Sequence, residues 1–135
     1  HVGNGTIFAN AATLAGHVTV GDFSTIGAYS GVHQYCRIGD HAFIGGYSVI
    51  TQDALPFTLT VGNRARSHGI NVLGLRRRHF SEETIAALRR AYRHLFRSKI
   101  RLSEAMAFVE EEMGSVAAVA YLLGFIRSSE RGVIR

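Results

Sequence analysis

The sequence predicts a β-solenoid followed by a small helical domain, and three observations support this fold class. Residues 2–55 repeat with a strict period of six, which fits neither a helix nor a hairpin sheet. Residues 56–80 are rich in Gly and Arg and have little periodicity. Beyond Ser81, apolar residues recur at helical spacing. We therefore expect a repeat domain over 1–55, an ordered connecting loop over 56–80 and a helical domain over 81–135.

Each hexad of the repeat begins with one large apolar residue and continues with small ones. The second position is small in seven of the nine hexads. One inward anchor per short strand and three strands per coil would stack residues n and n+18 at about 4.8 Å, giving about three coils. The nine anchors are Val2, Phe8, Leu14, Val20, Ile26, Val32, Ile38, Ile44 and Ile50.

His1 occupies the sixth position of a hexad whose first five positions precede the chain. A solenoid cut open in this way would expose a strand edge and an uncapped core. We therefore expect the chain to be a fragment, truncated at its N-terminus.

The last third of the sequence predicts helices. Ser81 is a candidate N-cap, with Glu82 and Glu83 in the first turn that follows it. A second helix is expected after Ser103, and a third from about Ser115 to Ile126. The third is apolar on nearly all sides, so it should be buried. The apolar positions of the first are Ile85, Leu88, Tyr92, Leu95 and Phe96.

The net charge of +5 is concentrated in one segment. Residues 64–101 contain eleven basic residues against two glutamates, and Arg suits phosphate and carboxylate contacts. A small phosphorylated ligand fits this segment at least as well as nucleic acid does, and we expect no nucleic-acid partner. No apolar run is long enough for a membrane span. The single Cys36 fits a reducing compartment, and we expect a cytoplasmic protein.

Several residues are candidates for chemistry, each with a structural alternative. His17 and His33 could act as acid, base or donor, or could be solvated on a prism face. Gly16 could bring its N–H close to a ligand, or merely relieve a crowded turn. The run from Asn71 to Arg78 is the clearest anion site, although its arginines could pair with Glu82 and Glu83 instead. The histidines show no metal-ligand spacing, so we predict no metal.

The segments NAATLAGHV, VHQYC, GNRA and GINVLGLRRRHFS, with the ending RGVIR, resemble the C-terminal half of the bacterial UDP-N-acetylglucosamine acyltransferase family. The resemblance implies a left-handed parallel β-helix and a homotrimer with active sites between neighbouring prisms. It also implies transfer of a (3-hydroxy)acyl group from acyl carrier protein to the 3-hydroxyl of UDP-N-acetylglucosamine, the first step of lipid A biosynthesis. The donor would be the carrier's phosphopantetheine thioester, with no cofactor. The general-base histidine would lie three residues before His1, leaving this chain inactive alone.

The resemblance also assigns roles to individual residues. Gly16 would supply an N–H to the oxyanion of the thioester carbonyl. His17 and His33 would line the catalytic cleft and position donor and acceptor. Gly46 matches a position that limits acyl length, and a glycine there suggests a longer chain. Nucleotide-sugar and phosphopantetheine contacts would come from Gln34, Asn71, Arg77 and Arg78.

Two features qualify the resemblance. Leu73 stands where some members have an acidic residue that contacts uracil, and Ala28 replaces a common glycine near the acyl groove. Both concern substrate preference rather than the reaction class.

The basic residues Arg89, Arg90 and Arg93 could meet the acidic carrier protein. Two alternatives stay open: the N-acyltransferase that acts later in the same pathway, and a catalytically silent trimerisation or binding module.

Overall fold

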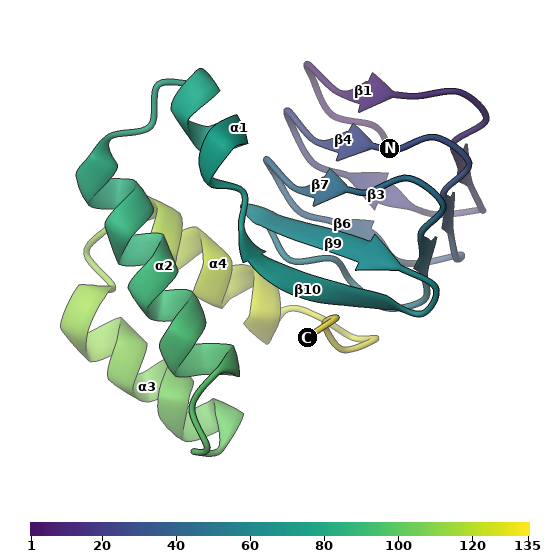
Figure 1. The fold of residues 1–135 in the computed structure, drawn as a ribbon. Helices are drawn as coiled ribbons and strands as arrows, with labels where there is room; N and C mark the ends of the chain where they lie inside the picture. Colours follow the sequence, from purple (N-terminus) through teal and green to yellow (C-terminus); the bar gives the residue numbers. More distant parts are fainter.

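The computed structural model describes all 135 residues and consists of a three-sided solenoid with a helical domain packed beside it (Figure 1). The solenoid strands are β1 (Ile7–Phe8), β2 (Thr13–Leu14), β3 (Thr19–Val20), β4 (Thr25–Ile26), β5 (Gly31–Val32), β6 (Arg37–Ile38), β7 (Phe43–Ile44) and β8 (Val49–Ile50). A hairpin follows, made of β9 (Thr58–Gly62) and β10 (Ala65–Ile70). The helices are α1 (Val72–Arg77), α2 (Glu82–Phe96), α3 (Leu102–Met113) and α4 (Ala117–Arg127).

The strands stack in the register that the hexad period predicts. Parallel pairing joins β1 to β4 to β7, β2 to β5 to β8, and β3 to β6. Thr25 pairs with Ile7 on one side and with Phe43 on the other, a step of 18 residues each time. The expected solenoid of about three coils is therefore confirmed.

The solenoid core is a column of hexad anchors. The anchors Val20, Ile26, Val32, Ile38, Ile44 and Ile50 are buried. Val2 and Phe8, the first two anchors, are 46% and 38% exposed because no coil of this chain stacks on them. Burial of each aliphatic side chain contributes about 1.5–3 kcal/mol, so the core strengthens away from His1.

The corners of the prism place large residues in the left-handed backbone region. From Ala11 to Tyr47, the residue at the fourth hexad position has φ between 57° and 65°. Most of these residues are aromatic, and those one coil apart stack, as Tyr29 does on Tyr47 with centroids 5.4 Å apart. The cost of the left-handed backbone at each corner is thus offset in part by ring stacking.

Aspartates at the third hexad position tie successive coils together. The N–H of Asn4 donates to Asp22 Oδ1 at 2.7 Å, and the N–H of Asp22 donates to Asp40 Oδ1 at 2.8 Å. This ladder runs beside α4. Burial, together with the nearby Asp40 carboxylate, raises the pKa of Tyr121 on that helix.

The connecting loop expected over 56–80 is instead the β9–β10 hairpin and helix α1. Strand β9 continues the sheet of β7, but Phe43 pairs with Leu59, a step of 16 residues rather than 18. The hexad pattern fails here because Thr58 and Thr60 are the buried positions of β9. The Thr58 hydroxyl is satisfied by Leu55 O at 2.8 Å, so a polar residue occupies a core position.

The helical domain has its own core, and its helices lie close to their expected positions. The Ser81 hydroxyl accepts the N–H of Thr84 at 3.1 Å, which confirms it as the N-cap of α2. Helix α3 begins at Leu102, and its N-cap is Arg101 rather than Ser103. Helix α4 is buried through Val119, Leu122, Leu123, Phe125 and Ile126, as its apolar sequence predicts.

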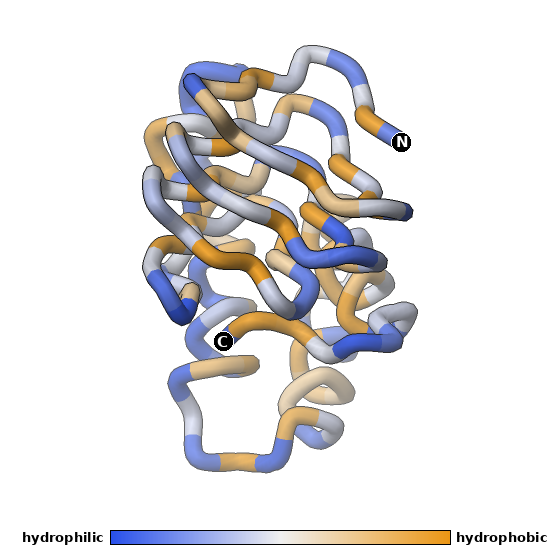
Figure 2. The backbone as a smooth tube through the Cα atoms, turned by 90° about the vertical axis from the view of Figure 1, so that its right-hand side faces the viewer, coloured by the Kyte–Doolittle hydropathy of each residue, from blue (hydrophilic) through white to orange (hydrophobic).

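The C-terminal tail closes the lower end of the solenoid, and Figure 2 shows its hydrophobic end beside the last coil. Asp53 N–H donates to Gly132 O at 3.0 Å, and Ile134 N–H donates to Asp53 O at 2.9 Å. The Ile134 side chain is 5% exposed and packs in the solenoid core. The tail therefore joins the two parts of the chain.

Candidate active site

The predicted site residues fall into separate groups on different corners of the prism. Gly16, His17 and Gln34 lie on the turns that connect the β2–β5–β8 face with the β3–β6 face. Asn71, Arg77 and Arg78 lie on or beside α1, next to the face formed by β1, β4 and β7. The pocket that Asn71, Arg77 and Arg78 line contains no member of the first group.

The first group presents a histidine and a free backbone donor. His17 has φ 60°, and its ring stacks on Tyr35 with centroids 4.8 Å apart and planes 3° apart. The carbonyl of Gly16 accepts the Tyr35 N–H at 3.1 Å, whereas the N–H of Gly16 makes no backbone hydrogen bond. A Cβ on Gly16 would meet nothing within 4 Å, so crowding does not explain this glycine. His33 is exposed and lines a shallow groove of about 350 Å³ on the β2–β5–β8 face.

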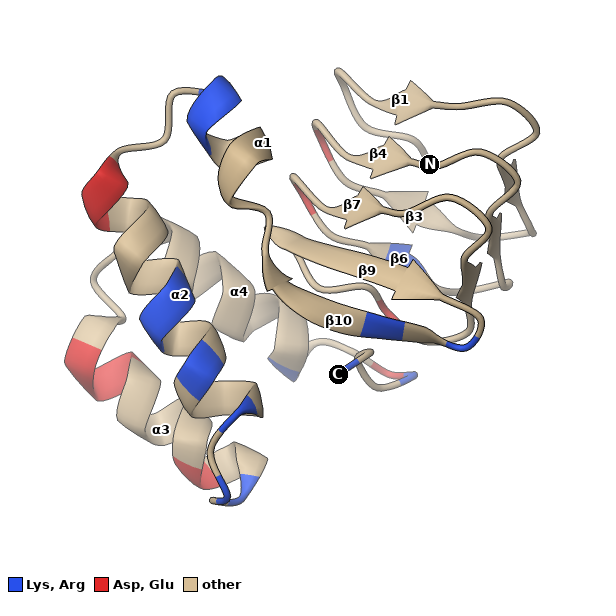
Figure 3. Ribbon diagram, viewed as in Figure 1, with Lys and Arg blue, Asp and Glu red and all other residues tan.

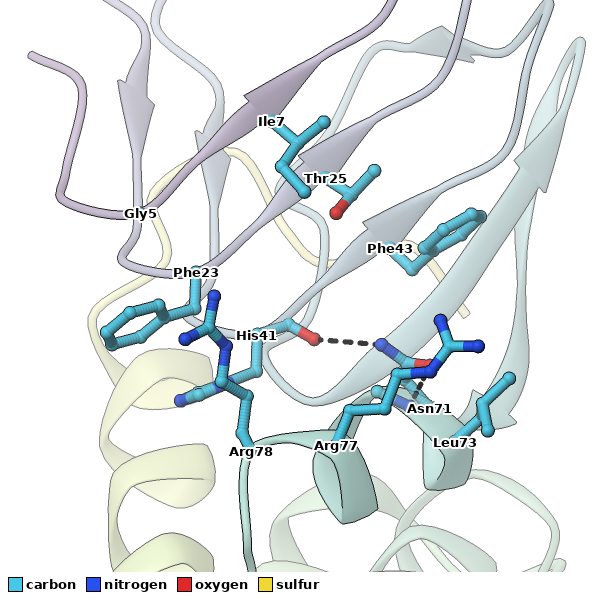
Figure 4. Close-up of a pocket in the computed structure, with 11 residues that line it drawn as sticks. Gly5, Ile7, Phe23, Thr25, His41, Phe43, Asn71, Leu73, Arg77 and Arg78 are labelled. Carbon is cyan, nitrogen blue, oxygen red and sulfur yellow. Dashed lines mark hydrogen bonds between the residues drawn. The ribbon is translucent and has the colours of Figure 1, made fainter.

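The second group lines a pocket of about 300 Å³ between α1 and the solenoid (Figure 4). Asn71 caps α1: its Oδ1 accepts the Gly74 N–H at 3.2 Å, and its Nδ2 donates to His41 O at 3.4 Å. A Cβ on Gly74 would lie 2.3 Å from Asn71 Nδ2, so a larger residue at that position would displace the capping side chain. Asn71 thereby holds the start of α1 against the corner of the prism.

The three consecutive arginines differ in whether they form an ion pair. Arg76 pairs with Glu82 at 2.7 Å, so the structural alternative holds for this residue. That pairing raises the pKa of Arg76 and lowers the pKa of Glu82, chiefly through the hydrogen bond between them. Arg77 and Arg78 line the pocket and take part in none of the ion pairs of the chain. Their donors are available to a ligand.

Phe23 and His41, at one end of the pocket, were not among the site residues predicted from the sequence. The Arg78 guanidinium lies over the Phe23 ring, 4.2 Å from its centroid. Phe23 stacks on His41 at 5.2 Å, and His41 stacks on Phe57 at 5.9 Å. Burial lowers the pKa of His41, and Arg78 adds to this effect, while Asp40 and Asp22 oppose it. The signal in the sequence was the step of 18 residues between Phe23 and His41 at the fourth hexad position.

Gly46 lies one coil below Ala28, at a third corner of the prism. A Cβ on Gly46 would lie 3.4 Å from Ala28 O, so the two positions that were linked to the acyl group are adjacent. Leu73 lines the pocket and is 60% exposed.

The basic charge of α1 and α2 is visible in Figure 3, and part of it surrounds a second groove. Arg89, Arg93, Arg97 and His68 line this groove of about 500 Å³ between α2 and β10. Arg90 is exposed but does not line it. Arg97 donates to Tyr92 Oη at 3.1 Å and to Ser67 O at 3.3 Å, which fixes one wall.

No group of three or more His, Cys, Asp or Glu residues converges in a way that could hold a metal ion. None of the helices combines the length and the apolar character that crossing a membrane requires.

The coiled repeat is of the bacterial transferase hexapeptide class, because residues 17–52 match the family model of six such repeats. Residues 53–134 match the model of UDP N-acetylglucosamine O-acyltransferase, domain 2. That match covers more than half of the chain, which therefore belongs to the UDP-N-acetylglucosamine O-acyltransferase family.

Individual relatives agree with this assignment. The chain is 54% identical over 134 residues to the acyl-[acyl-carrier-protein]–UDP-N-acetylglucosamine O-acyltransferase of Thermodesulfovibrio yellowstonii, covering 99% of this chain and 52% of that protein. The UDP-N-acetylglucosamine acyltransferase structure from Bacteroides fragilis superimposes with a TM-score of 0.96 at 37% identity, over 99% of this chain and 52% of that one. The structure of the UDP-N-acetylglucosamine O-acyltransferase from Moraxella catarrhalis superimposes with a TM-score of 0.93 at 38% identity, over 98% of this chain and 51% of that one. The chain thus spans about half the length of the relatives it matches.

Proposed function

We propose that the protein to which this chain belongs transfers a (3-hydroxy)acyl group from acyl carrier protein to the 3-hydroxyl of UDP-N-acetylglucosamine. Membership of the family and the names of the relatives support this reaction. They also favour it over the N-acyltransferase alternative. The observation that carries the proposal is the pocket with two arginines free of ion pairs beside α1, because a nucleotide diphosphate needs such donors.

The active site is assembled from two protomers of a homotrimer. Support comes from the placement of the predicted residues: His17 lies on one corner of the prism and Arg78 beside another, and the pocket that Arg78 lines does not include His17. A head-to-tail arrangement around a threefold axis brings unlike surfaces together, so it can place one corner of each prism against another corner of its neighbour.

In this site the 3-hydroxyl of the sugar loses its proton to a histidine base upstream of His1 and attacks the thioester carbonyl. The C–O bond forms, the C–S bond breaks, and the departing phosphopantetheine thiolate takes up the proton. The free N–H of Gly16 stabilises the oxyanion, a contribution of about 3–4 kcal/mol where one such donor has been removed from an enzyme. His17, His33 and Gln34 orient donor and acceptor, and Asn71, Arg77 and Arg78 hold the diphosphate and the phosphopantetheine.

The carrier protein docks on the basic surface of α2. Arg89 and Arg93 line the groove against β10, and this surface lies on the same side of the chain as α1 (Figure 3). Attraction between a basic groove and an acidic carrier speeds the encounter and weakens with salt.

The test is acyl transfer from 3-hydroxyacyl carrier protein to UDP-N-acetylglucosamine by the chain extended upstream of His1, beside residues 1–135 alone. Turnover by the extended chain only, together with trimer formation, is the expected result. Turnover by residues 1–135 at a similar rate would overturn the upstream base. Trimers of the extended chain that neither react nor bind the nucleotide sugar would favour the silent module.

A further inference from the structure

We propose that the stacked corner residues Phe23 and His41 form a platform that positions Arg78 and Asn71 for the nucleotide sugar, with Phe23 a positioning residue for Arg78. The inference rests on the proposed function, because it assigns to that site two residues with no role in it so far. It begins from the arrangement in Figure 4, where Phe23, His41 and Arg78 lie together at one end of the pocket.

Arg78 is held through its face rather than through its donors. Its guanidinium carbon lies 4.2 Å from the Phe23 centroid, and Arg78 belongs to none of the ion pairs. A guanidinium stacked on a ring loses rotational freedom, while its N–H groups remain able to form a bidentate contact. Positioning a free cation in this way lowers the entropy cost of binding an anion.

The platform is rigid because backbone and rings both fix it. Phe23 and His41 adopt φ of 58° and 57° at equivalent corners of successive coils. Phe57 supports His41 from the next coil, and Phe80 contacts the His41 ring edge-on at 4.8 Å. The ring beneath Arg78 therefore belongs to a column that is anchored in the fold.

The backbone of the same column also holds Asn71, the other residue proposed to contact the nucleotide sugar. His41 O accepts Asn71 Nδ2 at 3.4 Å, and Asn71 in turn caps the helix that carries Arg77. One column thus sets the position of Asn71 and of Arg78, on both sides of the pocket.

The test measures binding of UDP-N-acetylglucosamine by calorimetry to the upstream-extended protein and its variants. Phe23→Leu removes the ring but keeps a side chain with a similar apolar character and the same Cβ strain. We expect its Kd to rise by about two- to fivefold, the loss expected for one exposed cation–π contact. Phe23→Tyr keeps the ring and should bind as the wild type does. Phe108→Leu is the matched control, because Phe108 is 41% exposed and Phe23 39%, yet Phe108 lies on α3 away from the pocket.

A double-mutant cycle separates positioning from general damage. If Phe23 acts through Arg78, Phe23→Leu should cost nothing further in the background of Arg78→Ala. Additive losses in the double variant would overturn the inference, as would a Phe23→Leu Kd equal to that of the wild type. Wild-type protein that fails to bind UDP-N-acetylglucosamine would overturn the proposed substrate, and the platform with it. Either of the other two results, with normal binding by the wild type, would overturn the platform alone, so the two failures are distinguishable. Thermal melting of each variant identifies any loss caused by unfolding.

Discussion

Asp53 joins the last coil of the solenoid to the C-terminal tail, and its replacement by alanine should destabilise the chain strongly. Its side chain is buried, with 1% of the residue exposed. One carboxylate oxygen accepts the Arg37 N–H at 2.9 Å; the other accepts Arg37 Nε at 3.2 Å and Ser129 Oγ at 2.7 Å. Asp53→Ala leaves these three donors without their acceptor.

The expected loss follows from the environment of each donor. A hydrogen bond to a charged group contributes about 1.5–3 kcal/mol, and a donor left unsatisfied in a buried site costs a similar amount. The Arg37 side chain is 30% exposed and can regain water, so its share is small. The Arg37 N–H and the Ser129 hydroxyl therefore account for most of the cost. We expect the free energy of unfolding to fall by about 3 kcal/mol in total, which is the lower end of the range for a broken buried ion pair.

The assay is urea denaturation at one fixed protein concentration, because association would add to the apparent stability. The matched control is Glu110→Ala, which breaks the Arg127–Glu110 pair whose side chains are 47% and 57% exposed. That variant should lose less than about 1 kcal/mol. Equal losses for Asp53→Ala and Glu110→Ala would refute the reasoning that the tail is tied to the solenoid through a buried carboxylate.

Three further predictions concern separate parts of the chain. Burial lowers the pKa of folded His41 below 6.5, so the unfolded state binds protons more readily and the free energy of unfolding should fall as the pH drops below about 6.5. His41→Phe should make the free energy of unfolding depend less on pH, which urea denaturation at several values between about pH 5 and 8 would measure. The same pH dependence in the variant and the wild type would contradict this prediction. Gly46→Met should lower the ratio of long-chain to short-chain acyl transfer by about tenfold or more, measured with competing donors; an unchanged ratio would remove Gly46 from the acyl site. Ile134→Ala should cost about 2–4 kcal/mol in a urea titration, because its side chain fills the lower end of the solenoid core, and a loss below about 1 kcal/mol would contradict that packing.

The period of six predicted the solenoid well because stacking is a long-range consequence of a local repeat. Every coil must place its anchor above the previous one, so the partners of Thr25 could be read directly from the sequence. The β9–β10 hairpin could not be predicted, since Thr58 and Thr60 occupy its buried face and remove the hydrophobic alternation that marks a strand.

The sequence supplied candidate residues for the site but not their arrangement in space. The resemblance supplied His17, Asn71 and Arg78 as candidates, yet neither spacing nor composition indicates which corner of a prism a residue occupies. The sequence alone did not indicate Phe23 as a site residue, because an aromatic residue in a repeat usually serves packing. Its role depends on α1 bringing Arg78 back over the solenoid, 55 positions later in the chain.

Complementation between two inactive variants tests the central claim, that each active site combines two protomers. The upstream-extended protein would be prepared as His17→Ala and as Arg78→Ala, which disable opposite halves of the site. Each variant alone should be strongly impaired. Mixed trimers formed from equal amounts should recover about one quarter of the wild-type rate, because one in four head-to-tail contacts pairs two intact halves. No recovery in trimers shown to be mixed would place His17 and Arg78 in the same site of one protomer, and would contradict the account.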